Sequence, residues 1–278
     1  MKYNWLGKTG MKVSKLSFGA SPFGNIYKTN VSQLDATNMI ATAIEAGINY
    51  FDVAPYYGLG LAEEQLGLAL PKNTDNLIIS TKIGRYARNE FDFSIKRIRK
   101  SLATSMKKLN RDYIDIVICH DIEFIDHRQI MSSVIEFLLQ LKKEGVIRAI
   151  GISAFPLDVL QEVATKLEID VILSYCKYTL LDQSLLSLKP LINKKNIGLI
   201  NASPFAMGLL TEHNCPDWHP FSKDKLKEVT ELKKRATQQD VPVEKLALEF
   251  AQGCPISATT LTGFASMMEL RNGLSWVT

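Results

Sequence analysis

The stretch GINYFDVAPYYG (residues 47–58) begins as a short β-rich apolar run and then places an acid, Asp52, at the end of that run. A phenol, Tyr57, follows a few residues later. The run has the composition of a buried strand, so both polar side chains fall at or just past a strand's carboxyl end.

Two further stretches repeat this arrangement. NLIISTKIGRY (residues 76–86) places an amine, Lys82, at the end of an apolar run, and DYIDIVICHDIEF (residues 112–124) places an imidazole, His120, there. In a barrel of parallel strands all carboxyl ends open at one mouth, where that fold keeps its chemistry. We therefore expect Asp52, Tyr57, Lys82 and His120 to converge.

The whole chain alternates between short β-rich runs and stretches with apolar residues at helical spacing. The runs are near-continuously apolar, which is typical of parallel strands covered on both faces. Eight strand–helix units favour a closed (β/α)8 TIM barrel, an α/β fold, over an open sheet, and we predict a single domain spanning residues 1–278. The expected strands lie at residues 16–20, 48–52, 77–82, 113–120, 146–153, 169–174, 197–201 and 258–262.

Three local patterns refine this fold. The residues around Gly7 and Gly10 predict a small N-terminal β-hairpin that caps the barrel floor. In residues 207–224 the apolar residues recur with neither the strand nor the helix period, so we expect a functional loop that covers the mouth of the barrel. Only a short tail follows the eighth strand, which predicts a brief helix and a shortened C-terminus.

Composition limits the class of protein. The chain has 278 residues, a net charge of +4 and 46% hydrophobic residues, which fits one large globular domain rather than disorder. The densest basic stretch, residues 96–111, has apolar positions at helical spacing and reads as a solvated helix face, so we expect no nucleic-acid partner.

Cysteine usage and the termini point to a cytoplasmic protein. The four cysteines are far apart and form no C-x-x-C pair, which favours reduced thiols. The N-terminus has no apolar segment typical of a signal peptide, and no run is long enough to span a membrane. We therefore expect no membrane association.

The four polar groups suit the interconversion of a carbonyl and an alcohol. A tyrosine can transfer the proton, and a neighbouring ammonium favours its phenolate, since the ordinary pKa near 10 is too high for neutral pH. Asp52 would hold Lys82 in place, and His120 would polarise the substrate oxygen. Singly, each residue also has a structural interpretation, such as a loop aromatic, a turn cap or a buried imidazole.

The motifs resemble those of the aldo-keto reductases. FDVAPYYG with AEEQLG (residues 62–67), TKIGRY, LNRDYIDIVICH and LKKEGVIRAIGIS (residues 141–153) are similar to that family's signatures in the same order. The resemblance implies Tyr57 as proton donor or acceptor, Lys82 and Asp52 as its tuning pair, and His120 as the substrate-orienting group. It also implies a nicotinamide cofactor across the mouth.

Finer features resemble the L-galactose dehydrogenase branch of that family. They are HDIEF (residues 120–124), SYCKY (residues 174–178) and residues 202–220. This branch oxidises the anomeric carbon of an aldose to a lactone, so the resemblance implies a small sugar or carbonyl substrate and a monomer.

The residues expected to bind the cofactor, on the later strands, depart from the family pattern. Ala154, Tyr175 and Ala202 stand where the family usually has asparagine, glutamine and a stacking tyrosine. The resemblance implies a cofactor site that includes Ser153, Ser203, Gly263, Ser266 and Glu269. A carboxylate there repels a 2′-phosphate and accepts a hydrogen bond from a ribose hydroxyl, which favours NAD and leaves NADP possible.

Two alternatives stay open. Five residues that could bind a metal ion lie within residues 120–127, as in a metal-dependent hydrolase: His120, Asp121, Glu123, Asp126 and His127. The chain has only four histidines, however, and we expect no metal site. The shortened C-terminus is also compatible with a catalytically weakened member of the family that binds a cofactor or a partner.

Overall fold

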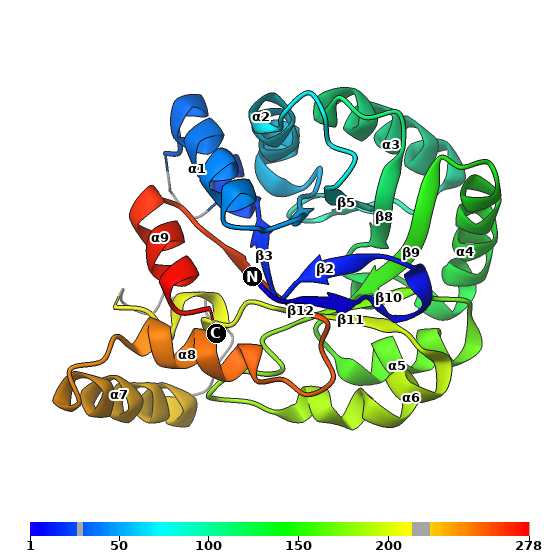
Figure 1. The fold of residues 1–278 in the computed structure, drawn as a ribbon. Coiled ribbons are helices and arrows are strands. Elements are labelled where there is room, and N and C mark those ends of the chain that lie inside the picture. Colours follow the sequence, from blue (N-terminus) through cyan, green and yellow to red (C-terminus); the bar gives the residue numbers. More distant parts are fainter. Residues whose placement is uncertain (27–29, 213–222, 278) are drawn as a thin grey trace.

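In the computed structural model, residues 1–26, 30–212 and 223–277 are described, and within them eight parallel strands close into one barrel (Figure 1). The strands pair in the order β10, β11, β12, β3, β4, β5, β8, β9, and β9 returns to β10. This confirms the predicted TIM barrel. The barrel strands are β3 (Leu16–Gly19), β4 (Tyr50–Asp52), β5 (Ile78–Ile83), β8 (Ile114–Cys119), β9 (Ile147–Ser153), β10 (Val171–Tyr175), β11 (Gly198–Ala202) and β12 (Thr259–Gly263).

Helices surround the barrel and connect successive strands (Figure 1). Two of them, α1 and α9, lie side by side although they come from opposite halves of the chain. The helices are α1 (Gln33–Glu45), α2 (Leu61–Ala69), α3 (Ile95–Leu109), α4 (His127–Lys143), α5 (Leu157–Lys166), α6 (Lys189–Lys195), α7 (Lys223–Gln238), α8 (Val243–Gln252) and α9 (Met267–Ser275).

The strands are apolar throughout because both of their faces are buried. Ile116 and Ile118 of β8 belong to the cluster that fills the barrel interior. Val117, between them, packs instead in the cluster beneath the helices. Successive side chains of a strand point to opposite faces, so two cores leave no exposed face for polar residues.

The N-terminal hairpin caps the barrel floor, as predicted. Strands β1 (Tyr3–Trp5) and β2 (Lys12–Ser14) pair antiparallel, and Figure 1 shows them lying across the barrel. The turn of the hairpin approaches the start of β11 so closely that a Cβ on Gly7 would lie 2.2 Å from the backbone nitrogen of Gly198. Leu6, between β1 and that turn, is fully buried in the interior cluster.

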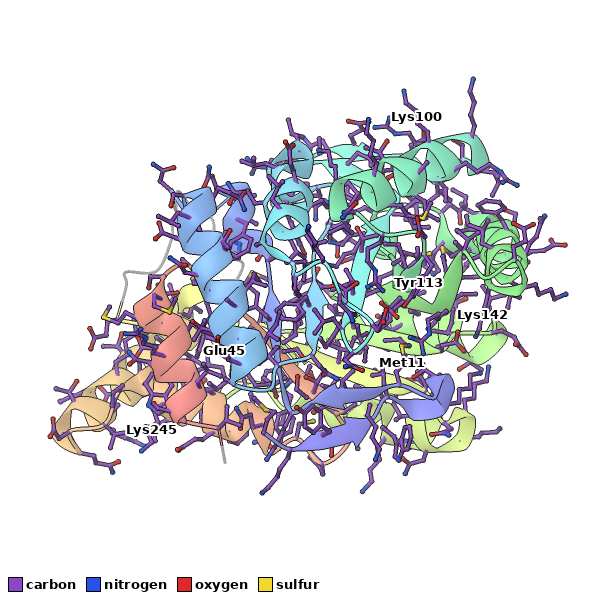
Figure 2. All side chains as sticks on the ribbon, turned by 45° about the horizontal axis from the view of Figure 1, so that its top comes forward. Met11, Glu45, Lys100, Tyr113, Lys142 and Lys245 are labelled. Carbon is purple, nitrogen blue, oxygen red and sulfur yellow. The ribbon has the colours of Figure 1, made fainter. Side chains whose placement is uncertain are left out.

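The helices follow their sequence signals. The Ser32 hydroxyl accepts a hydrogen bond from the backbone N–H of Asp35 at 3.1 Å and so caps α1. The apolar positions of α3, including Ile98 and Leu102, are buried. In Figure 2, Lys100 of α3 and Lys245 of α8 lie at separate edges of the molecule, and their side chains do not gather into one patch.

Other segments differ from the predicted elements or lie partly outside the described residues. An unpredicted hairpin, β6 (Arg85–Ala87) with β7 (Glu90–Phe91), follows β5 at the mouth. Of the expected loop at residues 207–224, residues 213–222 lie outside the described part. The brief helix expected after the eighth strand is α9. Within the described residues, no helix is long and apolar enough to cross a membrane.

Candidate active site

Asp52 and Lys82 form a buried ion pair at the ends of neighbouring strands. Asp52 is the last residue of β4, and Lys82 lies near the end of β5. The Lys82 Nζ donates to Asp52 Oδ2 at 2.5 Å and to the backbone oxygen of Val53 at 3.0 Å. Only 2% and 4% of the two side chains are exposed, so neither charge is satisfied by water and each depends on the other.

A hydroxyl chain inside the barrel holds the other oxygen of Asp52. The Ser80 hydroxyl donates to Asp52 Oδ1 at 2.6 Å. The Tyr50 hydroxyl lies 2.9 Å from Ser80 Oγ. Both oxygens of the carboxylate are therefore fixed, and with them the position of the Lys82 ammonium.

Tyr57 lies beside this ammonium in the loop after β4. The Lys82 Nζ is 4.8 Å from the centroid of the Tyr57 ring. A short 3₁₀ turn, Tyr57–Gly60, begins at this residue and leaves it half-buried. The tyrosine is thus next to a fixed cation and still partly open to the mouth.

His120 completes the group from the end of β8. Its ring meets the Tyr57 ring edge-on, with centroids 5.8 Å apart and an interplanar angle of 87°. Burial lowers the pKa of His120 to about 3, although Asp121 Oδ2 lies 3.6 Å from Nε2 and favours the charged form. At neutral pH the imidazole is uncharged, so it can offer a hydrogen bond to an oxygen but not a positive charge.

The structure therefore brings together all four residues that the strand ends predicted. A phenol beside a buried ammonium, facing a neutral imidazole, can move a proton to or from an oxygen held between them. Sequence reasoning missed Ser80 and Tyr50, which support Asp52 from within the apolar runs. The only sequence feature that could have identified them is the presence of a polar or amphipathic residue at an inward-facing position of a buried strand.

A charged group extends the site along the mouth. Arg85, just after β5, forms an ion pair with Asp121, just after β8. Tyr175, the last residue of β10, has its hydroxyl 3.4 Å from Asp121 Oδ1 and 3.4 Å from Glu123 Oε1. From the sequence, Asp121 and Glu123 were predicted only as possible metal ligands, and Tyr175 was identified only as a departure from the aldo-keto reductase motif. Arg85 was not anticipated.

The structure does not gather the five residues of the alternative metal site into one set of ligands. His127 pairs with Glu162 on α5, with Nε2 3.5 Å from Oε2. Asp121 is occupied by Arg85. No group of three or more His, Cys, Asp or Glu suited to a metal ion occurs among the described residues.

Four of the proposed cofactor residues lie at or after the ends of the paired strands β11 and β12. The backbone N–H of Ser203 donates to the carbonyl of Leu261 at 3.1 Å, and Gly263 ends β12. Ser266 caps α9 by accepting from the N–H of Glu269, and the Glu269 carboxylate accepts from the N–H of Ala265 at 2.8 Å.

Ser153 lies apart from these four, at the end of β9. It is buried, and its hydroxyl accepts a hydrogen bond from the backbone N–H of Asp121 at 3.2 Å. Its neighbour Ala154 is also buried, and so is Ala202, which ends β11 beside Ser203. Ser153 thus stands between the catalytic strands and the β11–β12 edge.

Comparison with known proteins agrees with this geometry. The model of the "Aldo/keto reductase family" matches residues 15–276. The chain is 41% identical to L-galactose dehydrogenase of Arabidopsis thaliana, over 98% of this chain and 87% of that protein. It is 33% identical to D-threo-aldose 1-dehydrogenase of a Pseudomonas species, over 73% and 69% of the two chains.

A solved structure shares the whole architecture. The holo form of aldo-keto reductase AKR11C1 from Bacillus halodurans superposes with a TM-score of 0.85 at 28% identity, over 99% of this chain and 90% of that chain. With the family model covering nearly the entire length, the chain belongs to the aldo/keto reductase family.

Proposed function

We propose that this protein oxidises the anomeric carbon of a neutral aldose to the lactone, with a nicotinamide dinucleotide as hydride acceptor. Aldo/keto reductases are NAD(P)-dependent oxidoreductases. The observation that carries the proposal is the buried Lys82–Asp52 pair beside Tyr57, with the neutral His120 edge-on to the same ring. This is an arrangement for proton transfer at a substrate oxygen.

The relatives support the choice of substrate class. Two of them are named as sugar dehydrogenases, L-galactose dehydrogenase and D-threo-aldose 1-dehydrogenase. In the ring form of an aldose, the anomeric carbon carries one hydrogen and one hydroxyl. Loss of a hydride from that carbon and of a proton from that hydroxyl yields the lactone, so atoms and electrons balance.

Each catalytic residue has a separate role in this reaction. Tyr57 removes the proton from the anomeric hydroxyl. Lys82, fixed by Asp52, stabilises the phenolate that performs this step. His120 donates a hydrogen bond to the same oxygen and orients it toward Tyr57. A nicotinamide, when bound, supplies the acceptor for the hydride.

The β11–β12 edge fits a dinucleotide. Ser203 directly follows β11, and Ser266 is the N-cap residue of α9, shortly after β12. Backbone N–H groups at a helix N-terminus are of the kind that bind phosphates. Glu269 stands in the first turn of that helix. Its carboxylate disfavours a 2′-phosphate, which supports NAD over NADP.

The weakened-member alternative has less support. A protein that only binds cofactor has no need of a buried ion pair, because burying two charges costs several kcal/mol unless each is well satisfied. Here every partner of Lys82 and Asp52 is in place.

A panel of aldoses tests the proposal. Purified protein is incubated with L-galactose, D-arabinose and D-glucose, each with NAD and with NADP, and reduced nicotinamide is followed by absorbance. We expect turnover with at least one aldose and a higher kcat/KM with NAD than with NADP. Absence of turnover with every aldose, in a protein that binds NAD in a calorimetric titration, would contradict the proposed activity.

A further inference from the structure

The mouth carries a compact group of charged and polar side chains that the proton-transfer mechanism does not use. Arg85, Asp121, Glu123 and Tyr175, here called the mouth cluster, follow or end β5, β8 and β10. In the barrel β8 lies beside β5, and only β9 separates it from β10. The Arg85 and Asp121 side chains are 16% and 5% exposed, so their ion pair is largely withdrawn from water.

The second carboxylate joins the same network. Glu123 Oε1 accepts from the backbone N–H of Phe155 at 2.9 Å. The Tyr175 hydroxyl reaches both carboxylates, at 3.4 Å each. Burial raises the pKa of Tyr175 above its usual value, so the phenol stays protonated and can donate. The cluster thus displays carboxylate acceptors and hydroxyl and guanidinium donors within one small area.

The cluster begins at the catalytic imidazole. Asp121 Oδ2 is 3.6 Å from His120 Nε2. The Arg85 guanidinium carbon lies 4.1 Å from the centroid of the Tyr56 ring, which is itself 6.0 Å from the His120 ring. A molecule held by His120 and Tyr57 at its reacting oxygen would therefore extend over the mouth cluster.

Three polar atoms here are buried without a partner among the described residues. They are Arg85 Nε, Glu123 Oε2 and His120 Nδ1. A buried polar atom without a hydrogen bond is costly, so its presence calls for a partner from outside the protein, such as a ligand or water, or for a catalytic role. A guanidinium nitrogen is a donor and a carboxylate oxygen is an acceptor. Hydroxyl groups, which both donate and accept, match this mixture.

We propose that the mouth cluster binds the hydroxyl groups of the aldose remote from the anomeric carbon and thereby selects an uncharged polyhydroxylated substrate. This inference rests on the proposed function. Arg85 is already paired with Asp121, and two carboxylates face the same space. A phosphorylated sugar or a sugar acid would meet repulsion, whereas a neutral aldose would meet donors and acceptors.

Two hollows elsewhere on the described surface fit this role less well. One of about 400 Å³ lies between α1 and α9, and one of about 370 Å³ lies beside the N-terminal hairpin at the barrel floor. Neither is lined by any residue of the catalytic group. A sugar bound in either would be remote from Tyr57.

The test compares the conservative variants Glu123→Gln and Asp121→Asn with wild type. Both keep side-chain shape, and asparagine tolerates the positive φ of 53° at residue 121. Oxidation of L-galactose with NAD is compared with reduction of butanal, an aldehyde without hydroxyl groups, with NADH. We expect the ratio of kcat/KM for L-galactose to that for butanal to fall at least tenfold in each variant, mainly through KM for the sugar. Glu136→Gln, an exposed position on α4, is the matched control.

Direct binding separates this inference from the proposed activity. Calorimetric titration with L-galactose should show binding to wild type that weakens at least tenfold in Glu123→Gln. L-galactose 6-phosphate, whose charge is remote from the anomeric carbon, should bind wild type more weakly than L-galactose. Sugar binding that depends on Glu123 without any turnover would support the inference while the proposed activity fails. An unchanged kcat/KM ratio in both variants, or equal binding of sugar and sugar phosphate, would overturn the inference.

Discussion

His120 shows how one residue links chemistry and stability. Its imidazole is buried between the Tyr57 ring and the mouth cluster, and burial lowers its pKa to about 3. In the unfolded chain the same group titrates near its ordinary pKa of about 6.5. Between these two values the unfolded chain binds a proton that the folded protein does not, so the stability contributed by neutral His120 is lost as pH falls below about 6.5.

This predicts a pH-dependent difference between wild type and His120→Gln, which cannot titrate. The free energy of unfolding of wild type minus that of the variant should fall by about 2 kcal/mol between pH 7.5 and pH 5, because each pH unit below the unfolded pKa is worth about 1.4 kcal/mol. Urea unfolding followed by circular dichroism at the two pH values measures it. A difference that stays constant across this range would show that His120 is not held neutral.

At the scale of elements, the AEEQLG motif positions α2 between β5 and α3. The Thr81 hydroxyl of β5 donates to Glu63 Oε1 at 2.6 Å, and burial raises the pKa of Glu63. Leu66 is fully buried. A Cβ on Gly67 would lie 1.9 Å from the backbone oxygen of Lys108, so only glycine allows the two helices to approach this closely.

Gly67→Ala should therefore destabilise the protein by at least about 2 kcal/mol, since the clash is with backbone that cannot turn aside. Chemical denaturation gives the free energy of unfolding. Leu68→Ala on the same helix is the control: its side chain is 66% exposed, and its removal should change stability by less than about 0.5 kcal/mol. Equal stabilities of Gly67→Ala and wild type would contradict the close packing of α2 on α3.

The same scale shows what sequence patterns could predict. All eight barrel strands were expected within a few residues of their observed positions, because strands buried on both faces leave long apolar runs. The hairpin β6–β7 was missed, since it is short and follows directly on a buried strand. Arg85, which begins this hairpin, acquires its partner Asp121 only through folding, 36 residues away in the chain.

At the scale of the whole molecule, the two ends of the barrel differ: one end is closed and packed, and the other carries the candidate active site. The floor is closed by the hairpin and Leu6, while the mouth carries Asp52, Tyr57, Lys82 and His120 on or just after β4, β5 and β8. The convergence of the four residues proposed to be catalytic was predictable because Asp52, Lys82 and His120 lie at the ends of apolar runs and Tyr57 follows one of these runs. The mouth cluster was not, because Tyr175, Glu123 and Arg85 become neighbours only when the barrel closes, and each alone resembles an ordinary surface residue.

The direct test of this account is the rate of aldose oxidation by Tyr57→Phe, followed as reduced nicotinamide at saturating NAD. Phenylalanine keeps the ring that packs against Lys82 and His120 and removes only the hydroxyl. Tyr113→Phe, just before β8 at the opposite end of the barrel, is the matched control (Figure 2). General acid–base catalysis contributes about 10²–10⁴-fold, so we predict at least a hundredfold lower kcat for Tyr57→Phe with NAD binding unchanged. Retention of more than a tenth of wild-type kcat would contradict the assignment of Tyr57 as the proton-transfer group.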